Sequence, residues 1–122
     1  SPASALDQGQ RLETAVFNAL RRRTPAVRVG SVCRLLIKEK SKNHEVDFVA
    51  GDALLMRAYS LIQVSVDMAS EKTREREIAA LDASMAQFDL GESAIVTMDE
   101  QADIPCEHGV VHVVPAWKWL LA

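Results

Sequence analysis

Two apolar runs, each carrying one polar side chain, dominate the middle of the chain within residues 43–67. The first is Glu45–Val49 (EVDFV), and the second is Leu61–Ser65 (LIQVS). Both are rich in β-branched or other apolar residues, so each is predicted to be a strand. An acid, Asp47, and an amide, Gln63, then fall inside neighbouring strands, where polar groups need partners. This stretch is therefore the first place to look for a site.

Strand alternation assigns these side chains to faces of the sheet. Val46 and Phe48 are expected to share one face of the first strand, with Glu45, Asp47 and Val49 on the other. If both strands turn their apolar faces to a common core, four polar side chains gather on one side of the sheet: Asp47, Gln63, Ser65 and Asp67.

The length of 122 residues predicts a single domain over residues 1–122. An apolar content of 48% and a charged content of 25% are typical of a globular protein. No apolar run is long enough to span a membrane and no secretory leader is visible, so a cytoplasmic location is expected. The start without Met suggests a piece of a longer protein. Cys33 and Cys106 are isolated and are expected to be reduced thiols.

Charge is distributed unevenly along the chain. Residues 1–42 hold nine of the 14 Lys and Arg and three of the 17 acids, which gives +6, whereas residues 43–122 hold five and 14, which gives −9. The basic third could follow a phosphate backbone. The other interpretation, a solvated surface that balances an acidic remainder, is favoured because the net charge is −3.

Hydrophobic periodicity predicts long helices over residues 7–23 and 70–88, capped by Asp7 and by Ser70 or Thr73. Strands are predicted over residues 31–37, 44–50, 93–97 and 110–115, and a further strand is predicted within residues 54–66, most strongly from Ser60. A turn is predicted at Gly51-Asp52, a polar loop over 98–107 and a short helix or turn over 117–121. The first three strands should form an antiparallel meander, and the second helix should connect a parallel pair. The fold class is therefore α/β, in the order α-β-β-β-α-β, around a central mixed sheet flanked by helices.

Oxygen ligands on adjacent strands can hold a hard cation such as Mg²⁺. Asp47 is the natural ligand, and the Gln63 amide oxygen and the Val64 carbonyl could join it. Glu13 could approach from the first helix, although an edge position turned to solvent is the favoured interpretation of Glu13 alone. Such a site could activate water for phosphodiester cleavage.

Six segments carry a resemblance to a known family. They are Gly9–Leu20 (GQRLETAVFNAL), Glu45–Val49 (EVDFV), Leu61–Asp67 (LIQVSVD), Thr73–Leu81 (TREREIAAL), Ala94–Glu100 (AIVTMDE) and Val113–Leu121 (VVPAWKWLL). In order and spacing they resemble the C-terminal domain of a family of prokaryotic AAA-type ATPases. That domain resembles in turn the restriction-endonuclease-like, or PD-(D/E)XK, superfamily. The resemblance covers nearly the whole chain.

The resemblance implies a restriction-endonuclease-like fold, with Glu13 as the helix acid, Asp47 as the metal-binding aspartate and Gln63-Val64-Ser65 as the (D/E/Q)-x-K element. Ser65 therefore stands where the superfamily has the lysine that orients water and supports charge on the phosphate. A cation from elsewhere could replace it, and three residues at the start of the next helix are the nearest in sequence: Lys72, Arg74 and Arg76. Loss or weakening of cleavage is favoured over such a rescue.

Three functions follow as expectations. The first is a nuclease-like, DNA-interacting domain of an ATPase with a degenerate Mg²⁺ site formed by Asp47, Gln63 and Val64. The second is a non-catalytic module that regulates or assembles the ATPase, whose ATPase module would be the partner. The third is an active Mg²⁺-dependent DNA endonuclease with a migrated basic residue. The sequence predicts no oligomeric state.

The remaining candidates are weaker. His108 and His112 are four residues apart, but the valines around them favour a strand, where this spacing is too long for both to bind one ion. A zinc site that includes Cys106 is one interpretation of this segment, but a surface loop without a metal is favoured. Trp117 and Trp119 are expected to pack the tail on the core, with docking of a neighbouring domain as the alternative.

Overall fold

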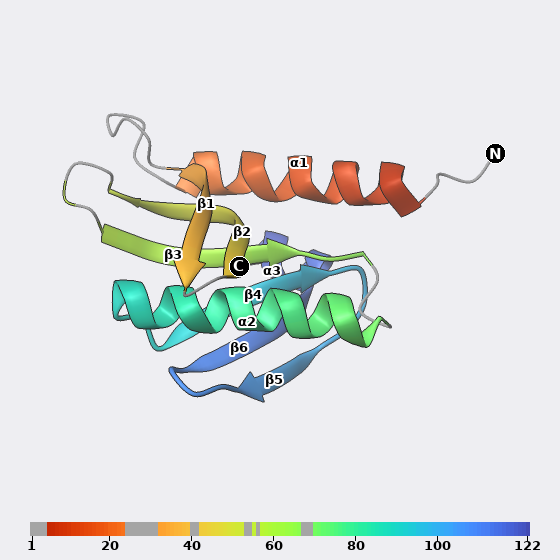
Figure 1. Cartoon of the computed structure of the whole chain (residues 1–122). Helices are drawn as coiled ribbons and strands as arrows, with labels where there is room; N and C mark the ends of the chain where they lie inside the picture. Colours follow the sequence, from red (N-terminus) through yellow and green to blue (C-terminus); the bar gives the residue numbers. More distant parts are fainter. Residues whose placement is uncertain (1–4, 24–31, 40–41, 53–54, 56, 67–69) are drawn as a thin grey trace.

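The computed structural model describes residues 5–23, 32–39, 42–52, 55, 57–66 and 70–122. The described elements are α1 (Ala5–Arg23), β1 (Val32–Glu39), β2 (Lys42–Asp52), β3 (Arg57–Val64), α2 (Glu71–Phe88), β4 (Glu92–Thr97), β5 (Ala102–Pro105), β6 (Val110–Pro115) and α3 (Ala116–Leu121). The predicted α/β class is confirmed, with a central mixed sheet flanked by helices (Figure 1).

The strands form one six-stranded sheet in the order β1-β2-β3-β4-β6-β5. β1, β2 and β3 are antiparallel, as predicted for a meander, and β3 and β4 are the predicted parallel pair across α2. β6 is parallel to β4, and β5 is antiparallel to β6 at the edge. The prediction of an unbroken polar loop over residues 98–107 is wrong, because β5 lies inside it. Pro105 is tolerated in β5 because β5 is an edge strand.

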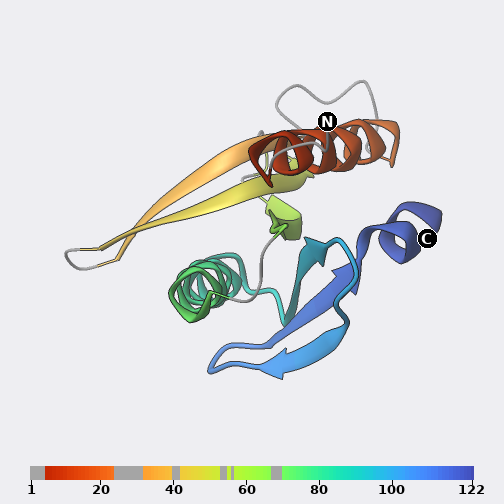
Figure 2. The same ribbon diagram turned by 90° about the vertical axis from the view of Figure 1, so that its right-hand side faces the viewer.

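Each face of the sheet has its own apolar core. On the face covered by α2, the core is formed by Val46, Val49, Ala58, Leu61, Ala80, Leu81, Met85, Ile95, Val111 and Val113. On the face covered by α1 and α3, it is formed by Leu12, Val16, Leu20, Phe48, Ala50, Ile62, Val64 and Val96, with Trp119 packed against it. Figure 2 shows α2 on one side of the strands and α1 and α3 on the other. The predicted packing of Trp119 on the core is confirmed, whereas Trp117 is 63% exposed.

The helix ends follow local chemistry, with one correction. The Ser70 hydroxyl accepts a hydrogen bond from the Thr73 amide at 3.4 Å, so the predicted cap of α2 is confirmed. α1 already includes Ala5, so Asp7 lies in its first turn instead of capping it. A carboxylate there still interacts favourably with the helix dipole. No helix among the described residues is long and apolar enough to cross a membrane.

An irregularity in β2 changes the predicted faces. Cys33 pairs with Val49 and Leu35 pairs with Val46, so two steps along β1 match three along β2. The extra residue is a β-bulge, which interrupts the alternation of side chains. Val46 consequently packs on the α2 face and Phe48 on the α1 face, so the prediction that they share one face is wrong. The bulge lies between Val46 and Val49, in the segment that contains Asp47.

A second irregularity lies where a turn was predicted. The β2–β3 register shifts between Ala50 and Gly51, and Gly51 and Asp52 still pair with β3. The predicted turn at Gly51-Asp52 is therefore part of β2. A Cβ on Gly51 would lie only 2.1 Å from the carbonyl oxygen of Arg57, so the close approach of the two strands requires glycine there.

Candidate functional site

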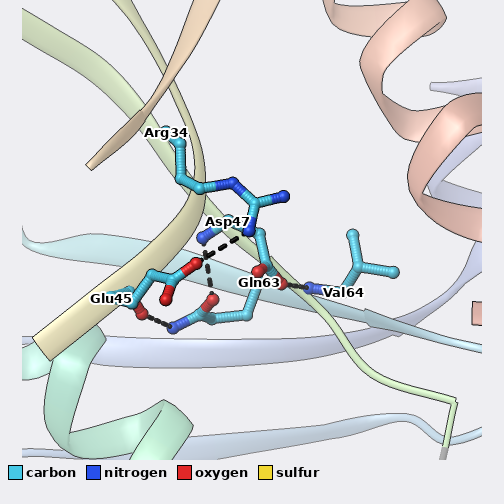
Figure 3. Close-up of polar contacts among 5 residues, drawn as sticks. All are labelled: Arg34, Glu45, Asp47, Gln63 and Val64. Atoms are coloured by element: carbon cyan, nitrogen blue, oxygen red, sulfur yellow. Dashed lines mark hydrogen bonds and ion pairs between the residues drawn. The ribbon is translucent and has the colours of Figure 1, made fainter. Parts of the chain in front are cut away.

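The side chains of Asp47 and Gln63 connect β2 and β3 just beyond the end of their ladder. The last backbone pair is Phe48 with Ile62. Beyond it, the Asp47 amide donates to Oε1 of Gln63 at 3.0 Å, and the Val64 amide donates to Oδ2 of Asp47 at 2.8 Å (Figure 3). Each side chain thus bonds the backbone of the opposite strand. The sequence prediction that these two polar residues meet is confirmed.

Gln63 is 2% exposed, and both ends of its amide are bonded. Its Nε2 donates to the carbonyl oxygen of Glu45 at 2.9 Å and makes a longer contact of 3.5 Å with the carbonyl oxygen of Glu77 on α2. Gln63 therefore ties β2, β3 and α2 together. Because the buried amide has partners at both ends, it stabilises the fold and fixes the spacing of β2 and β3 beside Asp47.

Next to this pair is a pocket of about 320 Å³, here called the Asp47 pocket. It is lined by Leu36, Asn43, Glu45, Asp47, Gln63, Arg76 and Glu77. Three of these side chains are acids, and they come from β2 and α2. The pocket thus combines carboxylates with one guanidinium, which is a donor set suited to a cation and to a phosphate beside it.

Asp47 is only partly exposed, and its charge is poorly solvated. Burial raises the pKa of Asp47, the hydrogen bond from the Val64 amide lowers it, and the negative charge of Glu13 raises it further. Arg34 opposes these effects from β1, where its Nη1 lies 2.7 Å from Oε1 of Glu45 (Figure 3). A positive charge in the pocket would favour the ionised form of Asp47.

Glu77 is the residue of this site that the sequence analysis missed. The charges around it in the sequence suggest a solvated helix face, but Glu77 is half-buried, and its Oε2 is a buried oxygen with no hydrogen-bond partner. Burial and then the charge of Asp47 raise its pKa to about 7, whereas Arg76 and a hydrogen bond with the Ser65 side chain lower it. Its spacing could have revealed it, since Glu77 precedes the buried Ala80 and Leu81 by three and four residues.

The other predicted site residues lie at different distances from this centre. Ser65 is buried and its side chain bonds Glu77, so the position of the missing lysine is next to the acids. Glu13 is half-buried and acts on Asp47 through its charge, but it does not line the pocket. Of the three cations considered as replacements, Arg76 lines the pocket and Lys72 and Arg74 do not. Asp67 lies outside the described residues.

The predicted metal ligands are present, but some of their atoms already take part in hydrogen bonds. Gln63 Oε1 and Asp47 Oδ2 each accept a hydrogen bond, and Val64 contributes its amide to Asp47. If a hard cation bound here, the second oxygen of Asp47 and the unpartnered oxygen of Glu77 would be its candidate ligands, with water completing its shell.

A second group of side chains, which includes Asp82 from the second half of α2, could hold a metal ion. Ligand atoms of Asp82, Glu107 and His108 all lie within 4.8 Å of one another. His112 lies elsewhere, with Nδ1 2.7 Å from Asp103 and Nε2 3.1 Å from Glu92, so the two histidines do not converge. Cys106 is a free thiol whose pKa is raised by burial and by Asp82. The Cys33 side chain lies outside the described part of the chain.

Comparisons of the chain with models of known families, with curated proteins and with solved structures gave no match.

Proposed function

We propose that this chain is a nuclease-like domain that interacts with DNA through a degenerate divalent-cation site, with weak or no cleavage. The proposal keeps the resemblance to the restriction-endonuclease-like superfamily and to an ATPase C-terminal domain as its premise. Asp47 is the principal metal ligand, and Glu77 is added to the predicted set.

The observation that carries the proposal is that the charge of Asp47 acts on a second half-buried carboxylate, Glu77. The charge of Asp47 raises the pKa of Glu77, so the two acids repel when both are ionised, and Glu77 has an oxygen without a partner. A bound cation would relieve the repulsion and supply that partner. Mg²⁺ suits this pair because it needs few protein oxygens and keeps several waters.

The lack of cleavage follows from Ser65. A serine hydroxyl carries no charge, and here it is already bonded to Glu77. Arg76 and Arg34 are the nearest charged substitutes, but Arg34 is paired with Glu45 at 2.7 Å and Arg76 acts on Glu77. Arg34 is thus engaged by Glu45 and Arg76 lies on the pocket wall, so neither guanidinium stands at position 65, where the lysine would support the attacking water and the phosphate together.

DNA as the partner is supported by exposed cations at the end of α1. Arg21 and Arg22 are exposed in its last turn, within the basic third of the sequence. Exposed guanidinium groups bind phosphates without reading base sequence. Binding should therefore weaken steeply as salt is added and should depend little on sequence.

Cleavage and binding of single- and double-stranded DNA in Mn²⁺ or Mg²⁺ test the proposal. We expect wild type to bind DNA and to cleave weakly or not at all, Ser65→Lys to gain cleavage, and Asp47→Ala in that background to lose it. Cleavage by wild type that disappears in Asp47→Ala would establish the active nuclease instead. If folded Ser65→Lys neither binds nor cleaves DNA, the proposal is overturned.

A non-catalytic interaction module is the second candidate, and exposed apolar side chains favour it. Trp117 is 63% exposed and Leu121 is 81% exposed, both on α3. Aromatic residues are enriched at the centres of protein interfaces. Absence of DNA binding, together with weaker binding to the ATPase module in Trp117→Ala, would favour this function.

A further inference from the structure

We infer that Asp82, Glu107 and His108 form a binding site for a transition-metal ion of the Zn²⁺ class, separate from the Asp47 pocket. The three side chains come from two parts of the chain that the fold brings together. Asp82 is on α2, and Glu107 and His108 are in the turn between β5 and β6. Their ligand atoms lie within 4.8 Å of one another, which is close enough for one ion to contact all three after small side-chain rotations.

The backbone around the turn is already fixed in place. The His108 amide donates to Oδ1 of Asp82 at 2.8 Å, which docks the turn on α2. The Cys106 amide donates to the Gly109 carbonyl at 2.7 Å, and the Val110 amide donates to the Gly91 carbonyl at 2.9 Å. Little ordering remains to be done when an ion binds, and such preorganisation increases affinity.

Close packing explains why the turn holds this shape. A Cβ on Gly109 would lie 2.4 Å from the Gly91 carbonyl oxygen and 2.8 Å from Sδ of Met85. Only glycine permits this approach of the turn to the end of α2. His108 is thereby held with Nδ1 3.3 Å from Oδ1 of Asp82.

The ligand types select the class of metal. One imidazole and two carboxylates suit Zn²⁺, Co²⁺ or Mn²⁺, whereas Mg²⁺ and Ca²⁺ prefer oxygen ligands alone. His108 and Glu107 are exposed and Asp82 is half-buried, so water can complete the coordination. Three protein ligands and one open coordination position are typical of catalytic zinc sites, whereas structural zinc sites have four protein ligands.

His112, on β6, provides a matched control. It too has an imidazole and two carboxylates, Asp103 and Glu92, but these contact opposite nitrogens of its ring. The ring therefore separates the two acids, and one ion cannot contact all three groups. The residue types are the same as in the inferred site, and only the geometry differs.

Isothermal titration of the full chain with Zn²⁺ tests the inference. We expect one Zn²⁺ to bind wild type, and His108→Ala or Asp82→Asn to weaken binding by about tenfold or more. His112→Ala and Asp47→Asn should leave it unchanged, and Asp47→Asn separates this site from the proposed cation pocket. His108→Ala keeps the backbone amide that docks the turn, so a circular dichroism spectrum should confirm that it is folded. No Zn²⁺ binding by wild type, or equal weakening by His112→Ala, would overturn the inference.

Discussion

Asp47 and Gln63 exchange side-chain hydrogen bonds with the backbone of each other's strand, at 3.0 Å to the Asp47 amide and 2.8 Å to the Val64 amide. The two side chains take over where the backbone ladder of β2 and β3 stops at Phe48 and Ile62. The separation of the strands and the position of the acid are therefore one feature. An acid held at such a point lies in the sheet and also borders a pocket.

Replacing Gln63 should cost more stability than its size suggests. Gln63→Leu removes the partners of the Asp47 amide and the Glu45 carbonyl, so we expect a loss of about 2–4 kcal/mol in the free energy of unfolding. Urea denaturation measures this loss. Gln87→Leu changes an exposed glutamine on α2 and should stay within about 0.5 kcal/mol of wild type. A similar loss in both variants would contradict the structural role of Gln63.

Glu77 should make stability fall with rising pH. Its pKa is about 7 in the folded chain against an ordinary value of 4.5. Ionisation of Glu77 therefore destabilises the fold increasingly as pH rises from 4.5 to about 7, and the full cost remains above that range. Glu77→Gln removes that cost, and we expect it to be more stable than wild type by about 1–2 kcal/mol at high pH without metal, after allowance for solvent screening. The advantage should vanish below pH 4.5.

Thermal unfolding across this pH range, with chelator present, measures the effect of Glu77→Gln. Glu75→Gln is the matched control, because Glu75 is exposed on the same helix. A difference between Glu77→Gln and wild type that does not change with pH would contradict the burial of an ionisable carboxyl.

His112 should stabilise the fold on the acid side of neutrality. Hydrogen bonds to Asp103 and then to Glu92 raise its pKa above the ordinary value of 6.5. Its contribution is complete below the unfolded pKa and is lost as pH rises through the folded value. We expect Asp103→Asn to lower the pKa of His112, measured by NMR titration of the imidazole. Asp99→Asn changes an exposed acid in the loop between β4 and β5, and it should leave the pKa of His112 unchanged.

Gly109 and Gly91 should respond differently to the same change. A Cβ at Gly109 would lie 2.4 Å from the Gly91 carbonyl oxygen, whereas a Cβ at Gly91 has nothing within 4 Å. We expect Gly109→Ala to destabilise the chain by about 1–3 kcal/mol and Gly91→Ala to have a much smaller effect. Equal losses in denaturation would show that the turn does not pack as described.

The sequence predicted the regular helices and strands better than it predicted the irregularities within the sheet. The polar residues inside two apolar runs predicted that Asp47 and Gln63 would meet, because such residues are rare in strand interiors, and the structure brings them together. The bulge between Val46 and Val49 has no distinctive local sequence, so the faces of Val46 and Phe48 were predicted wrongly. Bulges arise from pairing between strands, which a single sequence does not contain.

Glu77 and β5 were missed for different reasons. The many charges around Glu77 suggest a solvated helix face, and its burial depends on how α2 lies over β2 and β3. β5 is a short edge strand whose composition is typical of a loop. The restriction-endonuclease-like resemblance, and with it the function, remains a prediction.

The measurement that most directly tests the proposed cation site is paramagnetic broadening of amide NMR signals by Mn²⁺. We predict that a low concentration of Mn²⁺ broadens the amide signals of residues 45–47 and 63–65 in wild type. Asp47→Asn should abolish this broadening, whereas Glu75→Gln should not. His108→Ala should leave it unchanged, since the second metal site is separate. Broadening absent from these residues in wild type, or unchanged in Asp47→Asn, would contradict the cation site and leave the Asp47–Gln63 pair as a structural feature alone.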